Sequence, residues 1–221
     1  MSSLDFALAL AAAPALIPAV YLLALTLLSR RQGSPAPGAA GLRFDIVVPA
    51  HDEEASVGET VRSLLAIDYP RELFRVLLVA DNCSDQTAAR ARQAGASVLE
   101  RNDPSLRGKG YALKFGFEYC LAGPADAVVV IDADTIVSPN LLGAFAARLQ
   151  AGAPAVQADY AVRNPDASWR TRLMAIAFAT FHELRSLARE RLSVSCGLRG
   201  NGMCFTRALL IEVPYGAFSL V

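Results

Sequence analysis

The chain has 221 residues, enough for one domain with a sizeable hydrophobic core. Lysine plus arginine equals aspartate plus glutamate, at 21 each, so the overall charge gives no indication of nucleic-acid binding. The apolar content of 53% exceeds that of an ordinary soluble domain, and much of the excess lies near the amino terminus.

The segment from Phe6 to Leu28 has no charged residue and is long enough to cross about 30 Å of hydrocarbon as a helix. A cleaved signal peptide would need a basic start, whereas Asp5 precedes this segment and Arg30-Arg31 follows it. A buried helix of a soluble domain is a further interpretation, but nothing in the segment is polar enough to face water. We therefore predict a single-pass transmembrane anchor at residues 1–31. The positive-inside rule places its carboxyl-terminal side in the cytoplasm, at the inner (plasma) membrane.

Residues 32–41 (QGSPAPGAAG) are rich in Pro, Gly, Ala and Ser and are predicted to be a linker. Residues 42–221 are predicted to form the globular domain. Four cysteines without C-x-x-C spacing indicate free thiols in a reducing compartment. They are Cys83, Cys120, Cys196 and Cys204. With only two histidines to complete a ligand set, the sequence argues against zinc.

Strands and helices alternate along the globular part. Strands are predicted at residues 44–48, 74–80, 97–99, 127–131 and 155–160. Helices are predicted at residues 55–66, 87–94, 111–121, from 138 to near 152, and over a long stretch at 168–190. Repeated strand–helix units predict an α/β fold with a mainly parallel sheet and helices on both faces.

Acidic or polar clusters follow three of the predicted strands, at residues 51–54, at residues 81–87 and at Asp132-Ala133-Asp134. In a parallel sheet these loops converge on one edge. Two neighbouring carboxylates repel each other unless a cation lies beside them, and oxygen ligands suit Mg²⁺ or Mn²⁺, which often accompany phosphate. Each cluster could also be a solvated turn, and Asp81 and Asp85 could be helix caps. Their occurrence on one edge favours a metal-dependent nucleotide site.

A basic, glycine-rich segment, Arg107-Gly108-Lys109-Gly110, lies between the second and third of these clusters. Glycine allows the backbone to approach a ligand closely, and the two cations can pair with a diphosphate. The segment is neither a Walker A loop nor a G-x-G-x-x-G fingerprint. A solvated basic turn is the alternative, but the acids nearby need a counter-charge.

Together these segments resemble family 2 glycosyltransferases with the GT-A fold, from Phe44 to the last residue. The matching segments are FDIVVPAHDEE, LLVADNCSDQT, RGKGYAL, VVVIDADT, VQADY and CGLRGNGMCFTR. The most similar members are membrane-bound bacterial polysaccharide synthases of the cellulose, chitin and poly-N-acetylglucosamine type. The resemblance implies transfer, with inversion, of a sugar from a nucleotide-diphosphate sugar, taken as UDP-linked. The acceptor would be a glycan or lipid-linked molecule at the cytoplasmic face of the membrane, and Mg²⁺ or Mn²⁺ would assist.

The resemblance also implies roles for individual residues. Contacts to the nucleotide sugar are implied for Ala50, Asp52, Glu53, Asp81, Arg107, Lys109 and Asp132. Asp134 would ligate the cation, and Gln157, Gly200, Asn201 and Gly202 would flank the acceptor region. His51-Asp52 departs from the family, which more often has an aromatic residue followed by Asn. Asp52 therefore adds negative charge to a site that must hold a diphosphate.

In this family a Glu-Asp pair supplies the catalytic base, after a segment like the one from Pro214 to Val221. The chain stops at Val221, so we expect no catalytic base within it and expect it to be the amino-terminal part of a longer enzyme. Two other functions stay open. One is a nucleotide-sugar-binding fragment without turnover. The other is a sugar-nucleotide pyrophosphorylase, which should carry a Gly-rich loop where this chain has VPAHDEE.

Overall fold

The computed structural model describes residues 3–30 and 41–216, so the predicted linker at 32–41 lies, apart from Gly41, outside the described residues. The chain divides into two compact units. One comprises Met1–Gly33 and Asp159–Gly197, and the other comprises Ser34–Ala158 and Leu198–Val221. The structure thus groups residues 159–197 with the first helix, whereas the sequence predicts that residues 42–221 form one globular domain.

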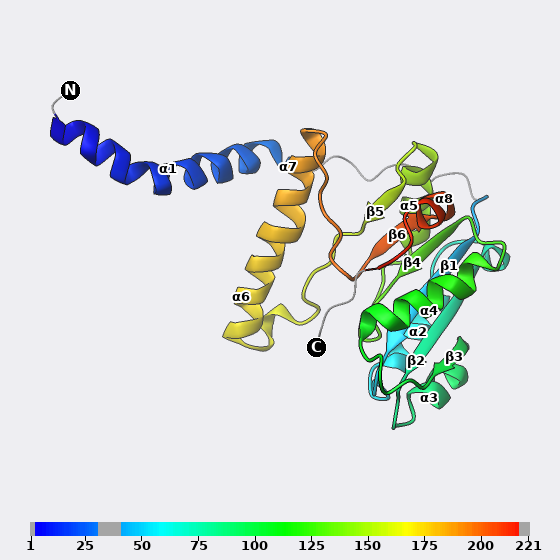
Figure 1. Ribbon diagram of the computed structural model, residues 1–221. Helices are drawn as coiled ribbons and strands as arrows, with labels where there is room; N and C mark the ends of the chain where they lie inside the picture. The colour runs from blue at the N-terminus through cyan, green and yellow to red at the C-terminus, as the bar shows by residue number, and fades with distance from the viewer. Residues whose placement is uncertain (1–2, 31–40, 217–221) are drawn as a thin grey trace. The chain divides into compact units, whose positions relative to one another are not determined.

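The larger unit is built on a six-stranded sheet with the order β3-β2-β1-β4-β6-β5 (Figure 1). The strands are β1 (Phe44–Ala50), β2 (Phe74–Asp81), β3 (Ser97–Arg101), β4 (Ala127–Val130), β5 (Ala155–Gln157) and β6 (Met203–Thr206). β1 pairs in parallel with β2 and β4, and β2 pairs in parallel with β3. β6 runs antiparallel to both of its neighbours. The predicted α/β fold with a mainly parallel sheet is confirmed, but β6 was not predicted.

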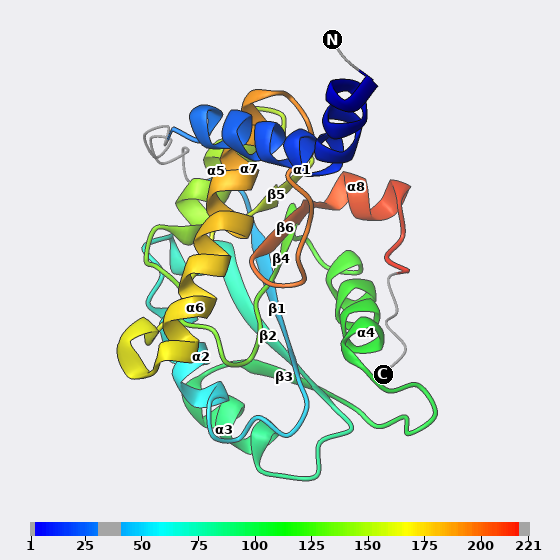
Figure 2. The same cartoon turned by 90° about the vertical axis from the view of Figure 1, so that its left-hand side faces the viewer.

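Helices cover both faces of this sheet (Figure 2). One face packs against α2 (Val57–Leu65), α3 (Thr87–Ala94) and α5 (Leu141–Gln150), and the other packs against α4 (Lys109–Leu121) and α8 (Arg207–Glu212). Along β1, Ile46 and Val48 belong to the first apolar cluster and Val47 to the second. Because both faces are covered, β1 and β4 read as nearly continuous apolar runs.

Local interactions define both ends of α3. Asp85 Oδ1 accepts a hydrogen bond from the backbone N–H of Thr87, the first residue of the helix, at 2.9 Å. Gly95 ends the helix with φ of 103°, a left-handed conformation that glycine adopts without a steric penalty. A short 3₁₀ turn, η1 (Arg71–Leu73), leads into β2.

The smaller unit is helical. It contains α1 (Ser3–Leu28), the short turn η2 (Pro165–Ala167), and a continuous run of α6 (Trp169–Phe178), η3 (Ala179–Leu184) and α7 (Arg185–Arg191). The long helix predicted at 168–190 is present, although its middle turn, η3, is a π-helix. Ser168 and Thr171 form a capping box at the start of α6, which accounts for the position of its first turn.

α1 forms over the segment in which the sequence predicts a transmembrane span, with Pro14 and Pro18 inside it. Among residues 3–30 and 41–216, no helix has the length and apolar character that crossing a membrane requires. The predicted span is therefore not found in the described residues.

Candidate active site

A pocket of about 540 Å³ lies at the carboxyl-terminal edge of the parallel strands in the larger unit. It is lined by the ends of β1 and β2, the start of α4 and the residues that follow β4. Most of the predicted nucleotide-sugar and metal residues line it: Ala50, Glu53, Asp81, Arg107, Lys109, Asp132 and Asp134. Segments far apart in sequence thus meet at one site, and the individual roles of these residues stay predictions.

Asp52 is not among the residues that line the pocket. Its carboxylate accepts hydrogen bonds from the backbone N–H of Ser84 at 2.7 Å and from the Ser84 hydroxyl at 3.1 Å. The bond from the Ser84 backbone is the main reason that the pKa of Asp52 lies below its usual value. In the structure this side chain holds the loop that follows β2, and the predicted contact between Asp52 and the nucleotide sugar stays a prediction.

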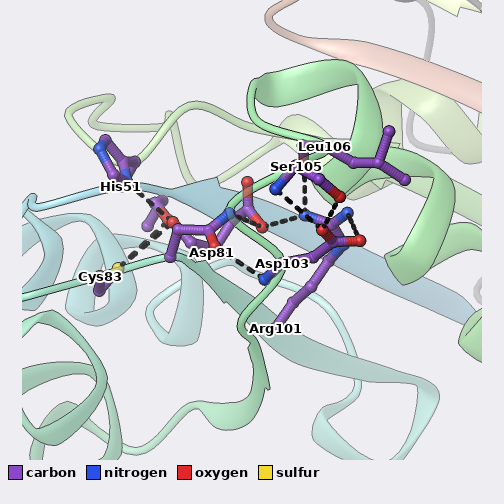
Figure 3. A network of polar contacts seen from close by, with 9 residues as sticks. His51, Asp81, Cys83, Arg101, Asp103, Ser105 and Leu106 are labelled. Atoms are coloured by element: carbon purple, nitrogen blue, oxygen red, sulfur yellow. Dashed lines mark hydrogen bonds and ion pairs between the residues drawn. The ribbon is translucent and has the colours of Figure 1, made fainter.

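Asp81 lies at the end of β2 and is only 4% exposed. Its Oδ1 accepts hydrogen bonds from Nη1 of Arg101 at 2.5 Å and from Nδ2 of Asn82 at 3.0 Å (Figure 3). Its carbonyl oxygen lies 2.8 Å from Nδ1 of His51. A buried carboxylate needs such partners, because an unpaired charge away from water is costly.

Arg101 was not among the site residues predicted from the sequence. In the parallel pairing of β2 with β3, Asp81 lies opposite Arg101, so the cation comes from the next strand of the sheet. The signal that could have identified it is the acid at the end of one buried strand together with a cation at the end of its neighbour.

Lys109, the first residue of α4, forms an ion pair with Asp132. Its ammonium group also donates to the carbonyl oxygen of Gly200 at 2.7 Å. Asn201 continues the connection, since its Oδ1 accepts from the backbone N–H of Asp132 at 3.1 Å and its Nδ2 donates to Thr135 at 2.9 Å. The turn at residues 200–202 is therefore joined directly to the D-x-D segment.

Gln157 holds the same turn from β5. Its Nε2 donates to the carbonyl oxygens of Asn201 at 2.7 Å and Gly202 at 3.3 Å, and its Oε1 accepts from the N–H of Arg199 at 2.9 Å. The residues expected to flank the acceptor region do lie together. The amide of Gln157 is engaged in shaping the turn, and contact of this region with an acceptor stays a prediction.

Asp134 is the carboxylate best suited to a divalent cation. It is exposed at the pocket and, within the described part of the chain, makes no hydrogen bond or ion pair. Its oxygens and the nearby carboxylate of Asp132 are the hard donors that Mg²⁺ and Mn²⁺ prefer. The residues present therefore fit the predicted metal.

A second group of potential ligands lies on the loops after β1 and β2. Ligand atoms of Asp52, Cys83 and Asp85 lie within 4.8 Å of one another. Both carboxylates already accept hydrogen bonds, from Ser84 and Thr87, and burial raises the pKa of the Cys83 thiol. This group is less suited to a hard cation than Asp134, whose carboxylate oxygens accept no hydrogen bond within the described residues.

Comparison with known proteins gives the family. The model of the glycosyltransferase-like family 2 matches residues 41–217. The beta-monoglucosyldiacylglycerol synthase of Synechocystis is 30% identical over 177 residues, which cover 76% of this chain and 36% of that protein. The glucosyl-3-phosphoglycerate synthase of Mycolicibacterium paratuberculosis is 36% identical over 103 residues, which cover 44% of this chain and 30% of that protein. The chain thus spans about a third of the length of these two relatives.

Solved structures agree with this family. The Mycobacterium tuberculosis glucosyl-3-phosphoglycerate synthase, in complex with Mn²⁺, UDP-glucose and phosphoglyceric acid, matches 82% of this chain and 64% of its own, with 26% identity and a TM-score of 0.53. The mannosyltransferase PcManGT of Pyrobaculum calidifontis, in complex with GDP-mannose and Mn²⁺, matches 96% of this chain and 58% of its own, with a TM-score of 0.68. At 20% identity the latter shows the GT-A fold alone.

The relatives are glycosyltransferases of various kinds, so the narrower resemblance to cellulose and chitin synthases is not supported. The family match over residues 41–217 shows that the chain belongs to the glycosyltransferase-like family 2.

Proposed function

We propose that the pocket binds a UDP-linked sugar and that the sugar is transferred, with inversion, to a hydroxyl of a glycan or lipid-linked acceptor. The observation that carries this proposal is the convergence of three kinds of group on one pocket. These are the buried carboxylate of Asp81, the cations of Arg107 and Lys109, and the available carboxylate of Asp134. A nucleoside, a diphosphate and a divalent cation need this combination.

Asp81 suits the nucleoside end of the ligand. One of its oxygens is occupied by Arg101 and Asn82, and an ionised carboxylate only accepts hydrogen bonds. Its partner on the ligand is therefore an N–H or O–H donor, such as the N3–H of uracil or a ribose hydroxyl. The M. tuberculosis relative that was solved with UDP-glucose supports the choice of a uridine nucleotide.

The diphosphate end faces positive charge from the start of α4. Arg107 is exposed at the pocket and makes no hydrogen bond or ion pair within residues 3–30 and 41–216. Gly108, with φ of 113°, caps the helix, and the free N–H groups of the first turn add partial positive charge. These groups would stabilise the negative charge that builds on the leaving diphosphate during transfer.

Asp134 and Asp132 would hold the cation, which when bound would neutralise part of the diphosphate charge. The acceptor hydroxyl must attack in line with the departing diphosphate and must lose its proton to a base. We place the acceptor on the side of the pocket formed by the 200–202 turn, because Lys109 and Asp132 connect that turn to the reacting end of the donor.

Calorimetric titration of the full chain with UDP, with and without Mn²⁺, tests the donor site. Asp134→Ala should abolish the gain in affinity that Mn²⁺ gives the wild type, because the cation loses a ligand. Asp81→Ala should weaken UDP binding by about tenfold or more with or without the metal, because the lost contact is to the nucleoside. An unchanged metal dependence in Asp134→Ala would contradict the metal assignment.

Product analysis separates transfer from nucleotidyl chemistry. Release of UDP from UDP-sugar with Mn²⁺ would support sugar transfer, whereas release of pyrophosphate would identify a pyrophosphorylase and overturn the proposal. UDP binding without any UDP release would instead favour a nucleotide-sugar-binding fragment.

We also propose that transfer takes place at the cytoplasmic face of the membrane, with α1 in contact with lipid. Its apolar side chains are largely uncovered within the described residues, with Leu16, Ile17 and Leu27 at 61%, 69% and 73% exposure. Arg30 follows the helix and would meet anionic headgroups. Flotation with anionic phospholipid vesicles tests this. The chain should float with the vesicles, and a variant with Leu16, Ile17 and Leu27 changed to serine should not. Equal flotation of the two proteins would contradict it.

A further inference from the structure

Arg101 lies outside the pocket lining, yet it contacts both of the segments on which the proposed donor site depends. Its side chain is 11% exposed and extends from the end of β3. It reaches Asp81 at the end of β2 and the loop of residues 103–108, which leads into α4 and carries Arg107 (Figure 3).

A single guanidinium nitrogen makes both contacts. Nη1 of Arg101 donates to Oδ1 of Asp81 at 2.5 Å and to the carbonyl oxygen of Leu106 at 2.8 Å. Because Nη1 carries two hydrogens at a fixed angle, the two acceptors are held in a fixed relation to each other. Leu106 directly precedes Arg107, so this geometry also fixes the start of the basic segment.

The remainder of the guanidinium strengthens the same connection. Nη2 lies 3.3 Å from Oδ2 of Asp103, and Oδ1 of Asp103 accepts from the backbone N–H and hydroxyl of Ser105 at 3.1 and 2.6 Å. The backbone N–H of Asp103 donates to Asn82 at 2.8 Å. The guanidinium also lies over the ring of Tyr111, in the first turn of α4, at 5.8 Å.

We propose that Arg101 is a positioning residue that couples the nucleoside-contacting carboxylate of Asp81 to the diphosphate-binding loop at residues 103–108. The inference rests on the proposed function of the pocket and goes beyond it, since Arg101 touches no part of the donor. Its effect on binding is transmitted in two directions, through Asp81 to the nucleoside and through Leu106 to the phosphates.

Inorganic pyrophosphate separates the two directions, because it can occupy the phosphate side of the pocket without contacting Asp81. Arg101→Lys keeps the positive charge but loses the rigid fork, so it cannot hold Asp81 and Leu106 together. Calorimetry of the full chain with Mg²⁺ should show that Arg101→Lys weakens both UDP and pyrophosphate binding, each by about tenfold. Asp81→Asn keeps an acceptor for Arg101, and it should weaken UDP binding while leaving pyrophosphate binding within about threefold.

Arg92→Lys is the matched control. Arg92 pairs with Glu100, also on β3, but both side chains are more than half exposed and lie outside the pocket lining. The UDP and pyrophosphate affinities of the Arg92→Lys variant should equal those of the wild type. Asp103→Asn provides a second test of the loop, because this substitution leaves no buried charge unpaired. Like Arg101→Lys, it should weaken pyrophosphate binding.

A folded Arg101→Lys protein with wild-type pyrophosphate affinity would overturn the coupling. If that variant does not fold, unchanged pyrophosphate affinity in Asp103→Asn would overturn it. If the wild-type chain binds UDP and the variants give these contradicting results, only the inference about Arg101 is refuted. A wild-type chain that binds neither UDP nor pyrophosphate refutes the proposed function as well.

Discussion

Lys109 has two partners in the structure, the carboxylate of Asp132 and the carbonyl oxygen of Gly200. Its charge is therefore shared between the D-x-D segment and the 200–202 turn before any ligand arrives. A diphosphate that enters the pocket competes with Asp132 for this ammonium, and a cation at Asp132 and Asp134 would release it. We expect the metal and the nucleotide to bind with positive cooperativity for this reason.

Lys109→Met should weaken UDP binding by about tenfold and reduce this cooperativity, because Asp132 no longer has a cation to give up. Calorimetry with and without Mn²⁺ measures both quantities. Lys114→Met is the control, since Lys114 pairs with Glu118 at 3.1 Å on the exposed face of α4. That pair should contribute less than about 1 kcal/mol to stability and nothing to binding. Equal UDP affinities in the two variants would contradict the role of Lys109.

Asp52 gives a prediction for pH. Its pKa is lowered in the folded state, chiefly by the Ser84 backbone N–H, so its contribution to stability is fully present above the unfolded pKa, about 3.9. That contribution is lost as the pH falls through the lower folded pKa. The urea midpoint of Asp52→Ala should therefore lie below that of the wild type at pH 6, and the difference should shrink at pH 3. A difference that is independent of pH would show that the carboxylate charge is not involved.

The positions of Asp81, Lys109 and Asp132 at the pocket could be predicted. Asp81 and Asp132 lie at strand ends that a parallel sheet brings together, and Lys109 belongs to the basic, glycine-rich segment between them in the sequence. The direction of Asp52 could not. Its backbone has φ of 53°, which turns the side chain toward Ser84 and away from the pocket. Arg101 was missed because its relevance depends on strand pairing, which adjacent residues in the sequence do not reveal.

At the scale of elements, β6 and the turn before it complete the site. β6 has four residues and pairs with β4 and β5 through long-range contacts alone, so no local sequence pattern indicates this strand. The strands β1, β2 and β4 were predictable because burial on both faces leaves long apolar runs. Because β6 runs opposite to β4, the turn that enters it lies at the edge where the parallel strands end, next to Asp132.

Gly202 in this turn should tolerate no side chain. Its φ is 66°, and a Cβ there would lie 3.0 Å from the Cβ of Ala158. Gly202→Ala should lower the free energy of unfolding by about 1–3 kcal/mol, measured in urea. Gly152→Ala is the control, because φ is 94° but nothing lies within 4 Å of the added Cβ. It should cost about 1 kcal/mol. An equal or larger loss in Gly152→Ala would show that the contact at Ala158 does not matter.

At the scale of the whole molecule, buried thiols mark both faces of the sheet. Cys204 belongs to the cluster that packs on α2, α3 and α5, and Cys120 belongs to the cluster that packs on α4 and α8. Burial raises the pKa of both thiols, so neither is a reactive thiolate in the folded protein. Cys196, in the smaller unit, is only partly buried.

Pulsed thiol labelling along a urea series should therefore give one midpoint for Cys120 and Cys204, because the two clusters share the same strands and unfold together. Cys196 should react at lower urea concentration, ahead of both. Mass spectrometry of the labelled peptides reads each site separately. Different midpoints for Cys120 and Cys204 would show that the two faces of the sheet unfold independently.

The contact between Lys109 and Gly200 joins residues that are 91 positions apart. During synthesis, β1 to β4 and α4 emerge first, so the acidic and basic residues of the pocket have been synthesised before the 200–202 turn. At about 5–20 residues per second, the turn at residues 200–202 follows some seconds later. Until then Lys109 has only Asp132 as its partner, and the edge of β4 that β6 will cover is open. We infer that the nascent domain passes through an interval with an exposed strand edge, in which a chaperone or a neighbouring chain can pair with β4.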